Sequence, residues 1–249
     1  MSKKFTYYGG IQTSLLPYLT AYWTADNIAT DVYVNNLGGA YISPNYNTGI
    51  NGEAFNFGSG TQIRYVDVPD NDLLSFTDGT NDVPFTISMW TYYYSFSSTG
   101  NWLINRRDST SSPNLEFQLL YSTNNSAIAF IKYSQSVNTN RVQTLSSVVP
   151  SLSTWEMWTI TSDGSKFGEK IYRNGVDVTG AASEVGTYVK MNNTNSTIKF
   201  GQAGFSLGNL SLKHRGMIDE VAIFNGTELT QLQIQDLYNG GVGKFYPNI

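Results

Sequence analysis

The stretch GMIDEVAIFN at residues 216–225 decides the fold. It is rich in β-branched and aromatic residues, which favour an extended strand on a half-buried surface. A helix signal follows closely, because Thr230 and Gln233 have the spacing of a capping box and Gly240-Gly241 allows a left-handed end. The carboxyl end of the chain is therefore predicted to be a strand and one short helix.

Further strand candidates precede this stretch, separated by turn signals such as Asn174-Gly175, the dipeptide most typical of a tight hairpin. Many short strands with polar turns between them, and no fixed-period repeat, predict one all-β sandwich or barrel over residues 20–249. The candidates are Leu19–Thr24, Glu53–Phe57, Ile63–Val68, Phe85–Tyr94, Leu103–Asn105, Leu115–Tyr121, Ala127–Tyr133, Trp155–Thr161, Lys170–Arg173, Ile198–Gly201 and Met217–Phe224.

Residues 1–19 differ from the rest of the chain. A short aromatic stretch there is broken by Gly9-Gly10, and Pro17 interrupts the next apolar group. The segment is interpreted as an amino-terminal arm that anchors the domain on another chain. A frayed terminus and an additional edge strand remain as alternatives.

Composition excludes several classes of protein. The 249 residues contain no cysteine, so disulfides and thiolate sites are impossible. Lysine and arginine number 15 against 19 acidic residues, without a basic cluster, so nucleic acid is not an expected partner. No apolar run reaches membrane-spanning length, and no signal peptide is recognisable at the amino end, so neither a membrane partner nor classical export is expected.

The order of the segments resembles the laminin-G-like branch of the concanavalin A-like lectin/glucanase superfamily over residues 20–240. The resemblance implies a jelly roll of two antiparallel sheets, one of them concave and able to hold a ligand, with one short C-terminal helix. It does not choose among lectins, glycosidases, adhesion modules and structural parts. The matching segments are LTAYW at 19–23, GEAFNF at 52–57, YVDVP at 65–69, FTISMW at 85–90, WEMWTITSDG at 155–164, KIYRNG at 170–175 and the stretch at 216–225.

Catalytic motifs are missing. Glucanase relatives use a Glu-X-Asp-X-X-Glu strand motif that places two carboxylates on one face, and the sequence lacks it. Asp219 and Glu220 are adjacent, so they are expected on opposite faces of the strand. His214 is the only histidine, and no Gly-X-Ser-X-Gly elbow is present. The sequence therefore predicts that the protein is not an enzyme.

A structural calcium ion (Ca²⁺) is one hypothesis from the resemblance. Glucanase relatives hold a metal on the convex side with an aspartate of the late strand and backbone carbonyls. Asp219 resembles that aspartate, and Gly52 lies near the segment that supplies a carbonyl. Alternatively, Asp219 caps backbone amides where strands cross, and the sequence leaves both roles open.

The aromatic stretch around residues 85–96 supplies the candidate carbohydrate site. Alternation along a strand assigns one apolar face to the core: Phe85, Ile87 and Met89. The other face is then predicted to be an open surface on which rings stack against sugars: Trp90, Tyr92 and Tyr94. Trp102 and Arg106 of the next segment would extend this surface. A bulge near Thr91 would instead bury the tyrosines.

These features together suggest a non-catalytic virion or appendage protein, from a bacteriophage, that displays a lectin-like module. Lectin-like domains face the outside, and a particle released by lysis explains an outside location without an export signal. The expected partners are a cell-surface glycan or polysaccharide and other virion subunits, the latter through residues 1–19. A purely structural decoration (cement) protein without sugar binding and an extracellular bacterial adhesion module stay open as alternatives. Homo-oligomer formation and the choice between a capsid and a tail-fibre location also stay open.

Overall fold

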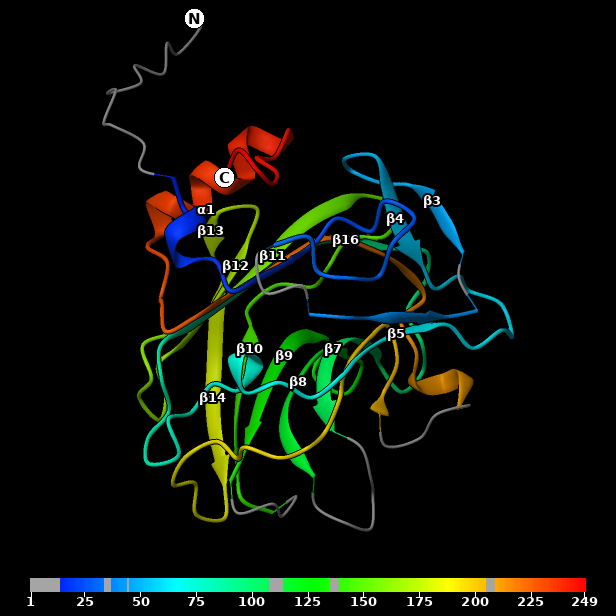
Figure 1. The fold of residues 1–249 in the computed structure, drawn as a ribbon. Coiled ribbons are helices and arrows are strands. Elements are labelled where there is room, and N and C mark those ends of the chain that lie inside the picture. The colour runs from blue at the N-terminus through cyan, green and yellow to red at the C-terminus, as the bar shows by residue number, and fades with distance from the viewer. Residues whose placement is uncertain (1–13, 34–36, 44, 108–113, 135–138, 205–208) are drawn as a thin grey trace, which may run out of the picture.

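The computed structural model describes residues 14–33, 37–43, 45–107, 114–134, 139–204 and 209–249. Two antiparallel sheets pack face to face, and one short helix lies near the C-terminus (Figure 1). This arrangement confirms the predicted all-β sandwich. Among the described residues, no helix is long and apolar enough to cross a membrane.

Sheet A has the strand order β13-β12-β11-β6-β16-β4-β3, and β1 pairs with β16 beside β4. The decisive stretch is β16, which lies centrally and pairs with β6 along most of its length. The bounds are β13 Val176–Asp177, β12 Glu169–Arg173, β11 Trp155–Ser162, β6 Phe85–Tyr93, β16 Gly216–Asn225, β4 Glu53–Asn56, β3 Tyr46–Thr48 and β1 Ala21–Trp23.

Sheet B has the order β14-β10-β9-β8-β7-β15-β5-β2. Consecutive hairpins build its centre, so β7 to β10 lie side by side. The bounds are β14 Thr179–Val185, β10 Arg141–Ser146, β9 Ala127–Tyr133, β8 Leu115–Ser122, β7 Asn101–Arg107, β15 Ile198–Phe200, β5 Tyr65–Val68 and β2 Ala40–Ile42.

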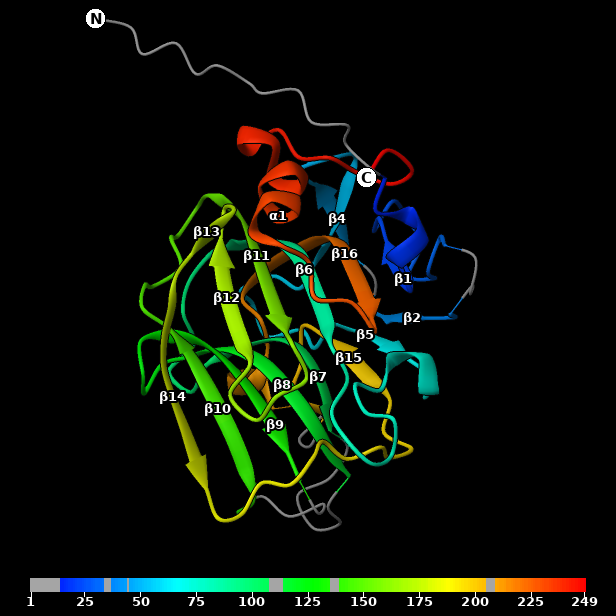
Figure 2. The same ribbon diagram turned by 90° about the vertical axis from the view of Figure 1, so that its left-hand side faces the viewer.

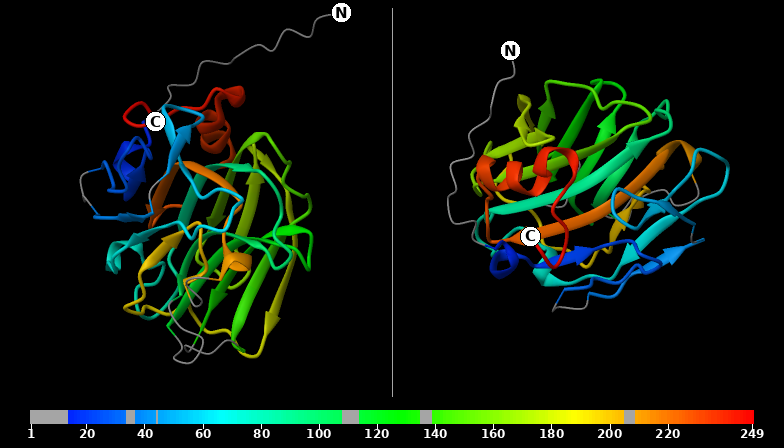
Figure 3. Two further views of the ribbon diagram at one scale, coloured as in Figure 1. Left: turned by 90° about the vertical axis from the view of Figure 1, so that its right-hand side faces the viewer. Right: turned by 90° about the horizontal axis from the view of Figure 1, so that it is seen from above.

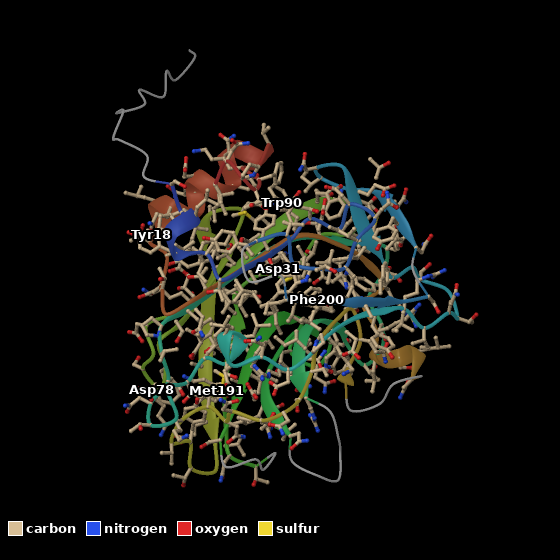
Figure 4. The ribbon with its side chains drawn as sticks, in the orientation of Figure 1. Tyr18, Asp31, Asp78, Trp90, Met191 and Phe200 are labelled. Atoms are coloured by element: carbon tan, nitrogen blue, oxygen red, sulfur yellow. The ribbon has the colours of Figure 1, made fainter. Side chains whose placement is uncertain are left out.

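The main hydrophobic core fills the space between the sheets. Trp23 of β1 meets Phe200 of β15 edge to face, with 5.2 Å between the ring centroids. Phe76 stacks on Phe85 at 4.2 Å, and Phe85 in turn contacts Phe130 of sheet B. Figure 4 shows Phe200 in this interior. Such aromatic pairs pack the two layers against each other through one core.

A second apolar cluster lies on the outer face of sheet A, beneath α1 (Gln231–Tyr238). The predicted capping box of Thr230 and Gln233 is present, and the helix ends at Asn239 in the left-handed conformation. Figure 3 shows α1 lying across part of sheet A. Short 3-10 turns occur at Leu16–Tyr18, Asp72–Leu74, Leu210–Leu212 and Asn239–Gly241.

Residues 14–19 belong to the domain and not to a separate arm. Leu15 is buried in the cluster beneath α1, and its backbone N–H donates to the carbonyl of Ile249 at 3.1 Å. Figure 2 shows the C-terminus next to this amino-terminal segment. The predicted boundary at residue 19 is therefore corrected, because apolar residues on both sides of it share one cluster. Residues 1–13 lie outside the described residues.

Candidate functional site

The predicted alternation of β6 is confirmed along the strand. Phe85, Ile87 and Met89 are in the core between the sheets, and Tyr93 continues the same face. The register between β6 and β11 is regular through Tyr92, so no bulge shifts the phase of β6. Consequently the alternate residues point away from the core.

Trp90 points outward but is not accessible. Its side chain is 3% exposed, because α1 and the C-terminal tail cover this half of the face. The ring of Tyr238 stacks on it, with 5.7 Å between centroids and 24° between planes. Figure 4 shows Trp90 below the C-terminal helical region. The expectation that Trp90 lines an open surface is therefore wrong.

Trp102 and Arg106 do not extend the surface around β6. The chain crosses from sheet A to sheet B between β6 and β7, so both residues belong to the other layer. Trp102 is 6% exposed and packs with Leu120. Arg106 is fully buried, ion-paired with Glu116 at 3.1 Å and with Asp70. The predicted site is corrected, because neighbouring segments in sequence lie in different sheets.

Tyr92, Tyr94 and Trp155 remain half-buried on the outer face of sheet A, and we call them the aromatic ledge. The ring of Tyr92 lies 5.5 Å from that of Tyr94 and 5.6 Å from that of Trp155, both edge to face. Trp155 of β11 stands directly across from Tyr92 in the strand register. Trp155 was not predicted as a site residue, although its Trp-led strand was recognised, because only the register places it beside Tyr92.

Polar groups border the ledge. The hydroxyl of Tyr94 donates to the side-chain oxygen of Asn56 at 3.3 Å. Partial burial raises the pKa of Tyr94, so its hydroxyl is neutral and can donate or accept a hydrogen bond at neutral pH. Flat rings with polar tips and neighbouring amides can hold a sugar by its C–H face and its hydroxyls together.

Asp219 and Glu220 lie close together because of a β-bulge. The register of β16 against β6 shifts between Asp219 and Ala222, and Glu220 adopts a left-handed φ of 51°. Asn51 contacts both carboxylates, donating its backbone N–H to Asp219 and its side chain to Glu220. The expectation of opposite faces is corrected, since the extra residue in the bulge turns both toward one loop. Both side chains are buried, and burial raises the pKa of Glu220 to about 7.

Asp219 caps backbone amides. Its oxygens accept from the N–H groups of Ile50 at 2.9 Å, Asn51 at 3.4 Å and Glu220 at 2.9 Å. Gly52 has a positive φ of 61°, and a β-carbon there would overlap the carboxylate of Asp26. The N–H donors around Asp219 favour the capping role, and the calcium ion at Asp219 and Gly52 stays a prediction.

We expect a chelator to leave the Tm of the protein unchanged, since hydrogen bonds rather than a cation satisfy Asp219. Asp219→Ala should lower the free energy of unfolding by about 2–3 kcal/mol, because it leaves buried N–H groups without an acceptor. Thermal unfolding with EDTA and with added calcium checks both statements. A Tm that rises with calcium and is lost in Asp219→Ala would restore the metal hypothesis.

A polar recess of about 370 Å³ lies between β12 and the start of α1. Lys170 and Glu228 form an ion pair across it at 3.0 Å, and the capping box satisfies the helix end. The ion pair and the capping box thus already engage Lys170, Glu228 and Thr230. The aromatic ledge remains the better candidate for a ligand.

Comparisons with known proteins agree on the fold. A family model, Laminin_G_3, described as the concanavalin A-like lectin/glucanases superfamily, matches residues 59–235. No curated protein sequence matches the chain. Solved structures are similar at low identity, which shows the fold alone.

Three of these structures illustrate the likeness. The binding domain of Paraclostridial Mosquitocidal Protein 1 has a TM-score of 0.69 at 15% identity, covering 91% of this chain and 53% of that one. Domain 4 of the extracellular arabinanase AbnA from Geobacillus stearothermophilus, in complex with arabinotriose, scores 0.57 at 16%, covering 91% and 98%. Botulinum neurotoxin type C, in a structure concerned with its interaction with two ganglioside molecules, scores 0.64 at 17%, covering 91% and 52%.

Proposed function

The chain belongs to the concanavalin A-like lectin/glucanases superfamily, and from this premise we propose that it is a non-catalytic carbohydrate-binding domain that uses the aromatic ledge. One observation carries the proposal. Tyr92, Tyr94 and Trp155 keep partly exposed rings on the outer face of sheet A, although neighbouring residues of that face are buried beneath α1.

The ledge is rigid, which suits recognition of a sugar. Its rings stand on the paired strands β6 and β11 and contact one another edge to face. A preorganised ring loses little conformational freedom when a sugar stacks on it. Asn56 and the Tyr94 hydroxyl add hydrogen-bonding groups at the rim.

The similar structures support this choice of ligand class. Domain 4 of AbnA has nearly the same length as this chain and is bound to an arabinose oligosaccharide. The chain spans about half the length of the toxin binding domains that it resembles. What those domains bind is therefore a property of proteins about twice as long as the matched region. An oligosaccharide is therefore the first ligand to test.

The absence of the glucanase carboxylate motif from the sequence supports a binding role over catalysis. The adjacent pair Asp219 and Glu220 is buried and serves the turn at residues 50–51. Incubation of polysaccharide with the protein should release no new reducing ends.

Replacing both tyrosines of the ledge should remove most of the affinity for the glycan. A stacked ring contributes about 0.5–1.5 kcal/mol, so Tyr92→Ala with Tyr94→Ala should weaken binding by about tenfold or more. A glycan array that includes arabinotriose identifies the ligand, and calorimetric titration measures its affinity. Phe167→Ala, which removes a 52% exposed ring elsewhere, is the matched control. Equal affinities of the double variant and the wild type would refute the ledge as the site.

Display on a bacteriophage virion stays a prediction from the sequence, as do the cement role and the bacterial adhesion module. Co-purification with a major capsid or tail protein tests the virion location. Recovery of the natural protein as a lone monomer would contradict it.

A further inference from the structure

Three cationic residues, Arg64, Lys213 and Arg215, lie at one end of the aromatic ledge, and we call them the cationic rim. Arg215 precedes the first residue of β16, and Gly216 pairs with Tyr93. Strand alternation therefore places Arg215 opposite Tyr94 on the outer face of sheet A. The backbone N–H of Tyr94 donates to the carbonyl of Arg215 at 2.9 Å, which fixes this neighbourhood.

The other two cations adjoin the same corner of the sheet. Lys213 is fully buried, and its ammonium donates to the backbone carbonyls of Phe57 at 3.3 Å and Gln62 at 3.0 Å. Arg64 lies against Gly58, where an added β-carbon would stand 3.1 Å from its Nη1. Phe57 immediately follows β4, whose Asn56 touches Tyr94.

No carboxylate neutralises the rim within the described part of the chain: none of the three cations takes part in an ion pair there. The Nε atoms of Arg64 and Arg215 are buried and have no hydrogen-bond partner. Burial, and then repulsion from Arg64 and Arg215, lowers the pKa of Lys213 to about 8. Like charges gathered without a counter-charge cost free energy, and a bound anion would offset that cost.

We infer that the ledge binds a sugar that carries a carboxylate, with the acid group on Arg215 and Arg64 and the ring on Tyr94. This inference rests on the proposed function and names its ligand class. A guanidinium holds a planar carboxylate through two parallel N–H bonds, and Arg64 and Arg215 are both only partly buried. The chain carries a net charge of −4, which favours a single acid group over a highly charged polyanion.

The test compares acidic glycans with their neutral counterparts. Sialyllactose against lactose, and a glucuronate-terminated oligosaccharide against its carboxyl-reduced form, represent the two sources of such an acid. For at least one pair, the acidic member should bind about tenfold tighter or better. Arg215→Gln and Arg64→Gln should each reduce the affinity for the acidic member toward that for the neutral one. Arg141→Gln on β10 of sheet B is the control and should change nothing.

Salt supplies a second readout. The affinity for the acidic member should fall between about 0.1 M and about 1 M salt, whereas that for the neutral member should hold. Equal binding of acidic and neutral members, unchanged in Arg215→Gln, would overturn this inference and leave the ledge function standing. Equal affinity for sulfated and sialylated lactose would overturn the choice of a carboxylate. If the ledge double variant loses affinity for the neutral member while Arg215→Gln keeps it, the rings and the cations act separately, and the two proposals can be judged apart. Binding of no glycan at all would overturn both.

Discussion

Trp90→Ala should lower the free energy of unfolding by about 3–5 kcal/mol, the usual cost of deleting a buried aromatic side chain. Trp90 is 3% exposed and lies between sheet A and α1, where Tyr238 stacks on it. Its removal would leave a cavity beneath the helix and weaken the attachment of the C-terminal tail. Urea unfolding followed by far-UV circular dichroism measures the loss.

Tyr92→Ala is the matched control, because Tyr92 is two residues further along the same face but half-buried. Its cost should stay below about 2 kcal/mol, since less surface is removed from contact. Trp90→Phe should restore much of the stability lost in Trp90→Ala, as a ring still fills the space. If Trp90→Ala unfolded at the wild-type urea midpoint, the covering of Trp90 by α1 would be wrong.

Lys132→Met should lower the free energy of unfolding by about 3–5 kcal/mol, because it leaves buried carboxylates without their cationic partner. Lys132 extends from β9 into the space between the sheets, where it pairs with Asp82 at 2.9 Å and with Glu169 of β12 at 2.7 Å. All three side chains are at least 96% buried. The ion group thus bridges sheet B to sheet A.

The loss should be smaller at low pH. Burial already raises the pKa of Glu169, and the charge of Lys132 opposes that rise. Without the lysine, the folded-state pKa of Glu169 rises further above its value in the unfolded chain. The contribution of Glu169 to folding stability is then present at low pH and lost as the pH rises. Lys132→Met should therefore be less destabilised at about pH 5 than at about pH 8.

Two further variants test the ion group. Lys132→Met with Glu169→Gln should recover part of the loss, because a neutral amide replaces one stranded charge. Lys170→Ala breaks a half-exposed pair with Glu228 and should cost no more than about 1 kcal/mol. A Lys132→Met variant as stable as Lys170→Ala at both pH values would contradict a buried ion group.

Much of the fold was predictable because its strands have strong local signals. The stretch at 216–225 is β16, and each of the other strand candidates overlaps a strand of the structure. Five strands were not predicted: β2, β3, β10, β13 and β14. The segment of β14, TGAASEV, is largely exposed and small, so it shows no apolar alternation. In β10 the burial does alternate from residue to residue, and RVQTLS carries that signal weakly in the sequence.

The candidate site was only partly predictable. Period-two alternation correctly turned Tyr92 and Tyr94 away from the core. It could not show that α1, some 140 residues later in the chain, lies over Trp90. Nor could it show that β7, the strand that follows β6, belongs to sheet B, so that Trp102 and Arg106 lie in the other layer.

By itself, then, the sequence determined the class of fold, the strand faces and the capped C-terminal helix, because neighbouring residues encode these through backbone geometry and alternation. Only the tertiary structure decided which outward-facing rings stay accessible, that Trp155 joins them, and that Arg64, Lys213 and Arg215 gather beside Tyr94. Burial and charge proximity depend on which distant segments pack together, and no local pattern of residues records that choice.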